Sequence, residues 1–184
     1  TAETVAEPDL QARFIEEARL ASRVRHGNVV IVLDSGISPD GTAWTFKLRK
    51  GVQFHHGKGE FTAKDVLHSW SLLTAPDSLE RRERWLSSVP KIDVVNDYEM
   101  VFHLSRPDQA FLWSFGEPDA GLEIVSKEDA ESRTRWVFED RAVAGTGPYA
   151  IKEWAQGTSI RFERVPFQHY RRTPDFPEFE FRFI

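Results

Sequence analysis

Apolar and polar side chains alternate along several short stretches of this chain, which is the pattern of strands that bury one face. The clearest example is the stretch 44–49, whose apolar positions are Trp44, Phe46 and Leu48. Asp40 and Gly41 precede it and form a strong turn signal. We therefore expect the end of a hairpin to lead into a strand here, with the three apolar side chains facing a core.

Alternating or β-branched stretches predict further strands along the rest of the chain. Two pairs of such stretches flank short turn sequences, Asn96-Asp97 and Gln156-Gly157, and these pairs predict β-hairpins. The predicted strands are residues 29–33, 92–95, 98–104, 122–125, 149–154, 159–164 and 179–184. Antiparallel hairpins are therefore the main expected element of the fold.

Apolar residues at helical spacing predict helices between these strands. The best-defined helix begins at Thr62, which can cap free backbone N–H groups while Asp65, three residues on, answers as a capping-box carboxylate. Its expected apolar stripe consists of Val66, Leu67, Trp70 and Leu73. Further helices are expected at residues 10–24, 78–86 and 110–115, and after Ser126.

The composition is that of a chain that can bury a substantial core, because 40% of its 184 residues are hydrophobic and 12% are aromatic. The net charge of -5 argues against a general nucleic-acid surface, which needs a basic face. The absence of cysteine excludes thiol nucleophiles, disulfides and zinc-thiolate sites. No apolar run is long enough to cross a membrane, and the acidic residues 1–7 do not have the pattern of a signal peptide.

Four side chains of metal-ligand types cluster in the sequence: His55, His56, Asp65 and His68. A metal-dependent enzyme using His55, His56 and His68 is one hypothesis for this cluster. Zinc motifs such as HExxH place two ligands one helical turn apart beside a base, and that spacing does not occur here. Neither a G-x-S-x-G nucleophile motif nor a G-x-x-x-x-G-K phosphate loop is present. Structural roles are therefore favoured over catalysis.

The stretch from residue 40 to residue 66, DGTAWTFKLRKGVQFHHGKGEFTAKDV, resembles a family signature. The family 5 extracellular solute-binding proteins, the peptide and nickel receptors of ABC importers, carry the form DG-x-x-W/Y-TF-x-LR-x-GV-x-F-HDG-x-x-FTA-x-DV. Two departures occur: His56 replaces the usual acid of HDG, and the loop before Phe61 is one residue longer. Residues 145–149, Gly-Thr-Gly-Pro-Tyr, match a second hallmark of the family, GTGPY.

The resemblance implies an α+β fold class, namely a fragment of a type II (cluster C) periplasmic-binding-protein-like fold with antiparallel hairpins packed with short helices. Full-length family members are well over twice as long, so a second large lobe would follow Ile184. The implied domains are a small accessory domain at 36–142 and the return into the first large lobe at 143–184. Residues 1–35, expected to hold a helix and a strand, are poorly covered by the resemblance.

The candidates for ligand contact are Arg82, Trp85, Thr146 and Tyr149. An arginine beside Trp85 would grip a carboxylate in bidentate fashion next to a flat apolar wall. The alternative is a solvated helix face anchored by one tryptophan. Thr146 and Tyr149 stand in GTGPY, whose two glycines favour an architectural role at the crossing between lobes over ligand contact.

The function implied by the resemblance is the non-catalytic substrate-binding component of an ABC importer, which captures an oligopeptide or another small polar solute between two lobes. The expected partners are that ligand and an ABC permease. We expect no cofactor, no metal, no nucleic acid bound by this domain and no membrane span, and we expect a monomer in the periplasm or at the cell surface. With its second lobe missing, this chain should bind ligand weakly or not at all.

One alternative is a cytoplasmic ligand-sensing domain of a transcription regulator that carries a solute-binding-protein-like module. The HHG variant at residues 55–57 and the absent leader favour this alternative mildly.

Overall fold

The computed structural model describes residues 32–78, 82–108, 110–111, 123–132 and 143–184, with the backbone alone described at 32–34 and 82–83. The chain divides into two compact units, each built from two separate segments: residues 1–49 with 73–122, and residues 50–72 with 123–184. The predicted helix at 10–24 and most of the one at 110–115 lie outside the described residues. No helix in the described part is long and apolar enough to cross a bilayer.

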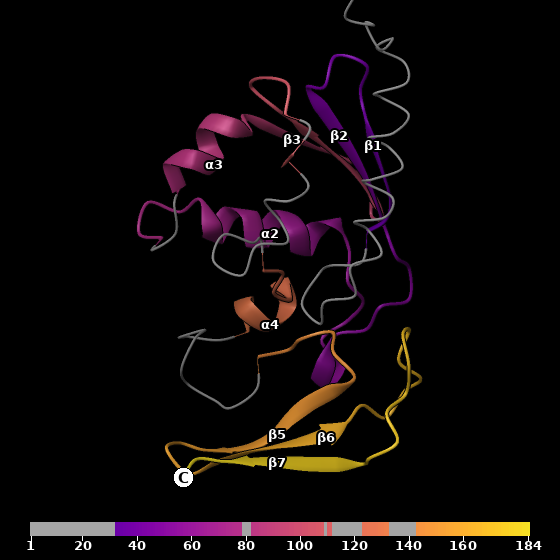
Figure 1. Ribbon diagram of the computed structural model, residues 1–184, viewed down its shortest axis with the longest axis vertical. Coiled ribbons are helices and arrows are strands. Elements are labelled where there is room, and N and C mark those ends of the chain that lie inside the picture. Colours follow the sequence, from indigo (N-terminus) through magenta and orange to yellow (C-terminus); the bar gives the residue numbers. More distant parts are fainter. Residues whose placement is uncertain (1–31, 79–81, 109, 112–122, 133–142) are drawn as a thin grey trace, which may run out of the picture. The chain divides into compact units, whose positions relative to one another are not determined.

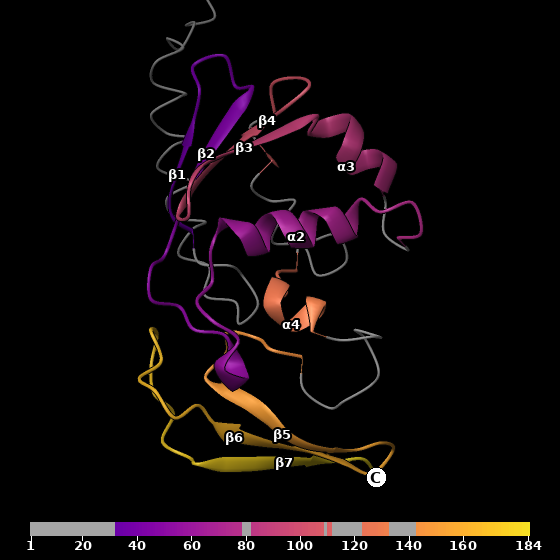
Figure 2. The same ribbon diagram turned by 180° about the vertical axis from the view of Figure 1, so that it is seen from behind.

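The first unit contains a four-stranded antiparallel sheet in the order β1-β2-β4-β3 (Figures 1 and 2). Its strands are β1 (Val32–Ile37), β2 (Ala43–Leu48), β3 (Lys91–Asn96) and β4 (Glu99–His103). The structure confirms the strand predicted from the alternation at 44–49 and the hairpin predicted around Asn96-Asp97. The prediction for β1 was wrong in its bounds, because the strand continues to Ile37 instead of ending at residue 33.

The buried face of this sheet follows from the period of two along β2 and β4. Trp44 lies opposite Phe102 and Phe46 lies opposite Met100, so all four side chains point to one face, and all are buried. The Phe46 and Phe102 rings meet edge to face with centroids 5.2 Å apart. The indole Nε1 of Trp44 donates to the carbonyl of Asp108 at 3.1 Å, which satisfies the one polar atom of that side chain.

The turn between β1 and β2 is closed by side chains as well as by the backbone. Both the Ser38 hydroxyl and the Thr42 amide donate to Oδ1 of Asp40, the second at 3.1 Å. The amide of Ala43 donates to the Ser38 hydroxyl at 2.9 Å. These contacts explain why the Asp40-Gly41 pair was a good turn signal, since a short carboxylate can hold the backbone that follows it.

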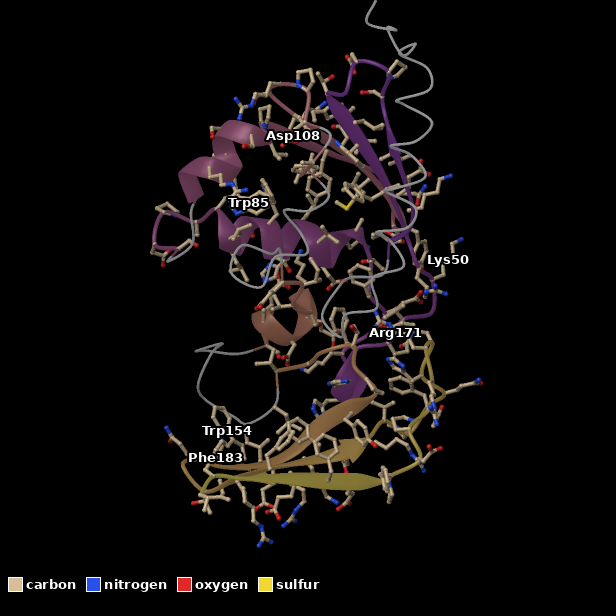
Figure 3. All side chains as sticks on the ribbon, viewed as in Figure 1. Lys50, Trp85, Asp108, Trp154, Arg171 and Phe183 are labelled. Atoms are coloured by element: carbon tan, nitrogen blue, oxygen red, sulfur yellow. The ribbon has the colours of Figure 1, made fainter. Side chains whose placement is uncertain are left out.

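The second unit contains a three-stranded antiparallel sheet in the order β5-β6-β7, with β5 at Tyr149–Ala155, β6 at Ser159–Arg164 and β7 at Glu178–Arg182. The predicted hairpin around Gln156-Gly157 is confirmed, and so is the final strand, except that it ends at Arg182 instead of the predicted residue 184. Gly157 has a φ of +73°, a left-handed conformation that a side chain would strain. One face of the sheet is aromatic, since Phe162 and Phe179 stack with ring centroids 4.7 Å apart. Trp154 and Phe183 lie at the same end of this sheet (Figure 3).

Helix α2 (Ala63–Leu73) belongs to the second unit up to residue 72, and it begins where the capping pair predicted. The amide of Thr62 donates to Oδ2 of Asp65 at 2.9 Å, which is one half of a capping box, and the Thr62 hydroxyl donates to the same oxygen at 3.2 Å. The predicted apolar stripe is correct for Val66 and Leu73, which are buried, but wrong for Leu67, which is exposed. The buried face passes instead through Ala63 and Ser69.

The segment before helix α4 (Lys127–Glu131) differs from the sequence prediction. Residues 123–125 are irregular and not the expected buried strand. The amide of Val125 donates to the hydroxyl of Ser69 on α2 at 3.0 Å, so this backbone is satisfied by a side chain instead of a ladder. Ser126 caps α4 as predicted, because its hydroxyl accepts from the amide of Asp129 at 3.2 Å.

Candidate functional site

The predicted contact residues Arg82 and Trp85 lie on helix α3 (Arg82–Ser88) in the first unit. This helix starts later than the predicted residue 78 and ends two residues beyond the predicted residue 86. Trp85 is only 2% exposed, and the guanidinium carbon of Arg84 lies 6.0 Å from the centroid of its ring (Figure 3). The side chain of Arg82 lies outside the described part, so its contact with a ligand stays a prediction, as does that of Trp85.

The predicted contact residues Thr146 and Tyr149 belong to the second unit, where both are half-buried. The hydroxyl of Tyr149 donates to the carbonyl of Phe176 at 2.8 Å, and its ring meets Phe179 edge to face at 4.7 Å. Tyr149 therefore holds the segment before β7 against the sheet. Its role in ligand contact, like that of Thr146, stays a prediction.

Each backbone carbonyl of residues 145–148 has a hydrogen-bond partner from another segment. The Gly145 carbonyl accepts from the amide of His55 at 2.9 Å, and the Gly147 carbonyl lies 2.9 Å from Nε2 of the same histidine. The Thr146 carbonyl lies 3.0 Å from Nε2 of His169. The Pro148 carbonyl accepts from the amide of Val165 at 3.1 Å. The loop is thus fixed by three residues from two other segments of the same unit.

A buried carboxylate holds the entrance of this loop. Oδ2 of Asp129, on α4, accepts from the amide of Ala144 at 3.0 Å. Its other oxygen lies 3.7 Å from the ammonium of Lys58, which provides the opposite charge that a buried carboxylate needs. The hydroxyl of Ser132 accepts from the same ammonium at 3.0 Å. Residues from the 55–60 segment and from α4 therefore act together on the start of the GTGPY sequence.

The electrostatics of the site favour a neutral imidazole at His55. Burial lowers the pKa of His55 from its ordinary value of 6.5, because a charged ring loses the solvation of water. Repulsion from His56 and His169 lowers it further, while the bond to the Gly147 carbonyl acts in the opposite direction. His55 sits in a single 3-10 turn, η1 (His55–Gly57), in which His56 adopts the left-handed φ of 56°.

A metal site was one hypothesis for His55, His56, Asp65 and His68. In the structure, two of these residues, His55 and Asp65, bond to backbone groups instead. Both ring nitrogens of His55 face the backbone of the 145–147 loop. Both carboxylate oxygens of Asp65 accept backbone amides, from Thr62 and from Lys127 at 2.9 Å. Among the described residues, no group of three or more His, Asp or Glu side chains is placed to hold a metal ion.

Sequence reasoning missed two of the residues that hold the loop and its entrance. His169 is 4% exposed and bonds to Thr146, 23 residues earlier in the chain, and Asp129 bonds to Ala144. A lone histidine or aspartate carries no signal for a partner that only the fold brings near. His55 was noticed as a metal-ligand type, although its partner lies 90 residues away.

Comparison with known proteins identifies relatives of this chain. The model of the bacterial extracellular solute-binding proteins, family 5 middle, matches residues 20–184. The oligopeptide-binding protein AppA of Bacillus subtilis is 31% identical over 125 residues, which cover 67% of this chain and 23% of AppA. The HTH-type transcriptional regulator SgrR of Salmonella choleraesuis is 36% identical over 127 residues, which cover 69% of this chain and 20% of the regulator.

A solved structure shows the same fold. The ABC transporter-associated periplasmic binding protein DppA from Helicobacter pylori, in complex with peptide STSA, superposes with a TM-score of 0.70 at 26% identity. The match covers 87% of this chain and 35% of DppA, so the chain spans about a third of that protein's length. The α+β architecture of hairpins and short helices is therefore part of a periplasmic-binding-protein fold.

Proposed function

Because this chain belongs to family 5 of the bacterial extracellular solute-binding proteins, we propose that it is part of a non-catalytic receptor for an oligopeptide or another small polar solute. The single observation that carries the proposal is the family match over residues 20–184, which includes both hallmark sequences. The names of two relatives, an oligopeptide-binding protein and a binding protein in complex with a peptide, support a peptide as ligand.

In this proposal the ligand binds between two lobes that close by hinge motion. Residues 36–142 form most of a small accessory domain, and residues 143–184 return into the first large lobe. The receptor then hands its ligand to an ABC permease, as a monomer in the periplasm or at the cell surface. The fixed backbone of the 145–148 loop supports an architectural role for GTGPY, since its carbonyls bond to this chain's own residues.

Ligand-dependent thermal unfolding of the complete protein that contains this chain tests the proposal. A ligand that binds only the folded state raises Tm, by an amount that grows with ligand concentration. We expect peptides of about two to nine residues to raise Tm, with an equimolar mixture of their free amino acids as the control. The proposal would be falsified if neither peptides nor other small polar solutes raised Tm or gave heat on titration. For the 184-residue chain alone we expect weak binding or none, and submicromolar affinity for a peptide would contradict the need for a second lobe.

A second candidate function is a cytoplasmic ligand sensor within a transcription regulator. The observation that favours it is the identity of 36% to an HTH-type transcriptional regulator, over nearly the same length as the match to the oligopeptide-binding protein. The sequence encoded before Thr1 separates the two candidates. A cleaved signal peptide or a lipid-modified cysteine there supports the transport receptor, whereas a helix-turn-helix module supports the regulator.

A further inference from the structure

Two buried histidines hold three consecutive residues of the second unit. His55 bonds to Gly145 and Gly147, and His169 bonds to the carbonyl of Thr146 between them. The two imidazoles are 6% and 4% exposed. Each ring uses both of its nitrogens, because Nδ1 of His169 also accepts from the amide of Arg171 at 3.3 Å. The loop conformation therefore depends on two titratable groups.

The partners fix the protonation state of each ring. A backbone amide can only donate, so Nδ1 of His55, 3.2 Å from the Gly145 nitrogen, must carry no proton. A carbonyl can only accept, so Nε2 of His55 must carry the proton that it donates to Gly147. The same reasoning applies to His169 between the amide of Arg171 and the carbonyl of Thr146. Both histidines are thus neutral, with the proton on Nε2.

A second proton on either ring is incompatible with this geometry. Protonation at Nδ1 would place an N–H group against the N–H of Gly145 or Arg171, which removes one hydrogen bond and sets two donors face to face. The ionisable groups near His55 are the imidazoles of His56 and His169, and both oppose a positive charge. His169 packs against the ring of Tyr170 at 4.2 Å, and the guanidinium of Arg171 lies 5.7 Å from that ring.

We propose that His55 and His169 form a proton-sensitive clamp on residues 145–147, which holds the loop while both rings are neutral and releases it when either is protonated. This property goes beyond solute binding and does not depend on it, because every contact lies within the second unit. The direction is fixed by linkage. A histidine with a lowered pKa in the clamped state takes up a proton on opening, so acid favours the open state.

Amide hydrogen exchange of the 184-residue chain, followed by NMR, measures the clamp directly. After correction for intrinsic exchange, the protection of the Gly145 amide should fall as pH decreases from about 7.5 to about 5. If opening takes up one proton, the equilibrium constant for opening changes by up to about tenfold per pH unit. If opening takes up two protons, it changes by up to about a hundredfold per pH unit. The slope therefore shows whether one or both histidines titrate.

Three variants separate the clamp from a general effect of pH. His55→Gln removes the titrating ring while keeping a donor and an acceptor on the side chain, so the pH dependence of Gly145 exchange should weaken. His103→Gln, in the first unit, is the matched control and should leave the pH dependence of Gly145 exchange unchanged. His56→Asn leaves the clamp residues intact, tolerates the left-handed backbone and removes a repelling charge. The pKa of His55 in the clamped state should therefore rise toward its ordinary value, so acid should reduce the protection of the Gly145 amide less than in the unaltered chain.

Nitrogen-15 spectra of the histidine rings in the unaltered chain provide a measurement that needs no variant. At about pH 7.5 they should show His55 and His169 as neutral rings protonated on Nε2. A charged ring or the other tautomer at that pH overturns the proposal. So does protection of Gly145 that stays constant between about pH 7.5 and 5. A pH dependence that His55→Gln and His169→Gln both leave intact would also overturn it.

Discussion

His55 and Gly145, which stand 90 residues apart, exchange two hydrogen bonds: the amide of His55 donates to the Gly145 carbonyl, and the Gly145 amide donates to Nδ1 of His55. A Cβ atom on residue 145 would lie 3.4 Å from Cε1 of the imidazole. The ring therefore leaves room for little more than a methyl group at residue 145, whose φ is not positive.

Graded substitutions at Gly145 should follow from this contact. Gly145→Ala places a methyl group at the edge of ordinary contact and should cost less than about 1 kcal/mol. Gly145→Val must displace the ring and should cost about 1–3 kcal/mol of unfolding free energy. Urea unfolding measures both, with Gly36→Val as the control, because a Cβ at Gly36 meets nothing within 4 Å. Equal costs for the alanine and valine variants of Gly145 would contradict the packing argument.

Asp65 joins the start of α2 to the start of α4, since its two oxygens accept from the amides of Thr62 and Lys127. Asp65→Ala leaves two amides without these acceptors, so we expect a loss of about 2–4 kcal/mol in the free energy of unfolding. Asp65→Asn keeps one carbonyl acceptor and should lose less. Denaturant unfolding provides the measurement, and Asp77→Ala, at an exposed aspartate, is the control. A cost for Asp65→Ala no larger than that of the control would show that the bridge does not stabilise the chain.

Trp44 and Trp154 both lie in strands but differ in burial, at 1% and 40% exposed. Trp44→Ala should cost about 3–5 kcal/mol because it leaves a cavity among Phe46 and Phe111. Trp44→Phe should cost about 1–3 kcal/mol, since the Asp108 carbonyl loses its donor. Trp154→Ala should cost less than about 1.5 kcal/mol. Thermal unfolding followed by calorimetry checks the order, and a reversed order would place the first unit's core elsewhere.

The turn at Asp40 should respond to acid. Hydrogen bonds from the Ser38 side chain and from Thr42 lower the pKa of Asp40 from 3.8 to about 2. Because the folded pKa lies below the unfolded one, the stabilisation by this carboxylate is present above about pH 3.8 and is lost as pH falls through about 2. Carbon-13 NMR of the carboxyl group measures the midpoint directly. A midpoint near 3.8 would show that these bonds do not form. An acid response of the Thr42 amide that persists in Asp40→Asn would show that another group causes it.

Much of the fold was predictable because local patterns determine it. The alternation in β2, the turn sequences at Asn96-Asp97 and Gln156-Gly157, and the pair Thr62 and Asp65 all act within a few residues of one another. Periodicity failed where burial depends on what the element packs against. Leu67 is exposed although it stands at helical spacing, and residues 123–125 are apolar at two positions without forming a strand.

The loop contacts were not predictable from the sequence for a different reason. The bonds between His169 and Thr146, between Asp129 and Ala144, and between His55 and Gly145 join residues 15 to 90 positions apart. No spacing rule connects such residues, because only the folded chain brings them together. The GTGPY sequence was noticed through its resemblance to a family hallmark, and the structure adds the side chains that hold it.

The ligand prediction for Arg82 can be tested on the complete protein. If its guanidinium grips a carboxylate of the ligand, Arg82→Ala should weaken binding by about 10- to 100-fold, because a charged hydrogen-bonded pair contributes about 1.5–3 kcal/mol. Arg82→Lys keeps the charge but not the planar fork, so its affinity for the ligand should lie between that of the unaltered protein and that of Arg82→Ala. Isothermal titration provides the measurement, with Arg106→Ala, at an exposed arginine of the first unit, as the control.

A second ligand with its C-terminus amidated makes this test specific to the pair. In the unaltered protein, amidation should cost about as much affinity as Arg82→Ala, since either change removes one partner of the same interaction. In Arg82→Ala, amidation should cost little more. Full additivity of the two losses would show that Arg82 acts elsewhere than on the ligand carboxylate. Unchanged affinity of Arg82→Ala for every ligand would leave α3 as a solvated face anchored by Trp85, which is buried in the first unit.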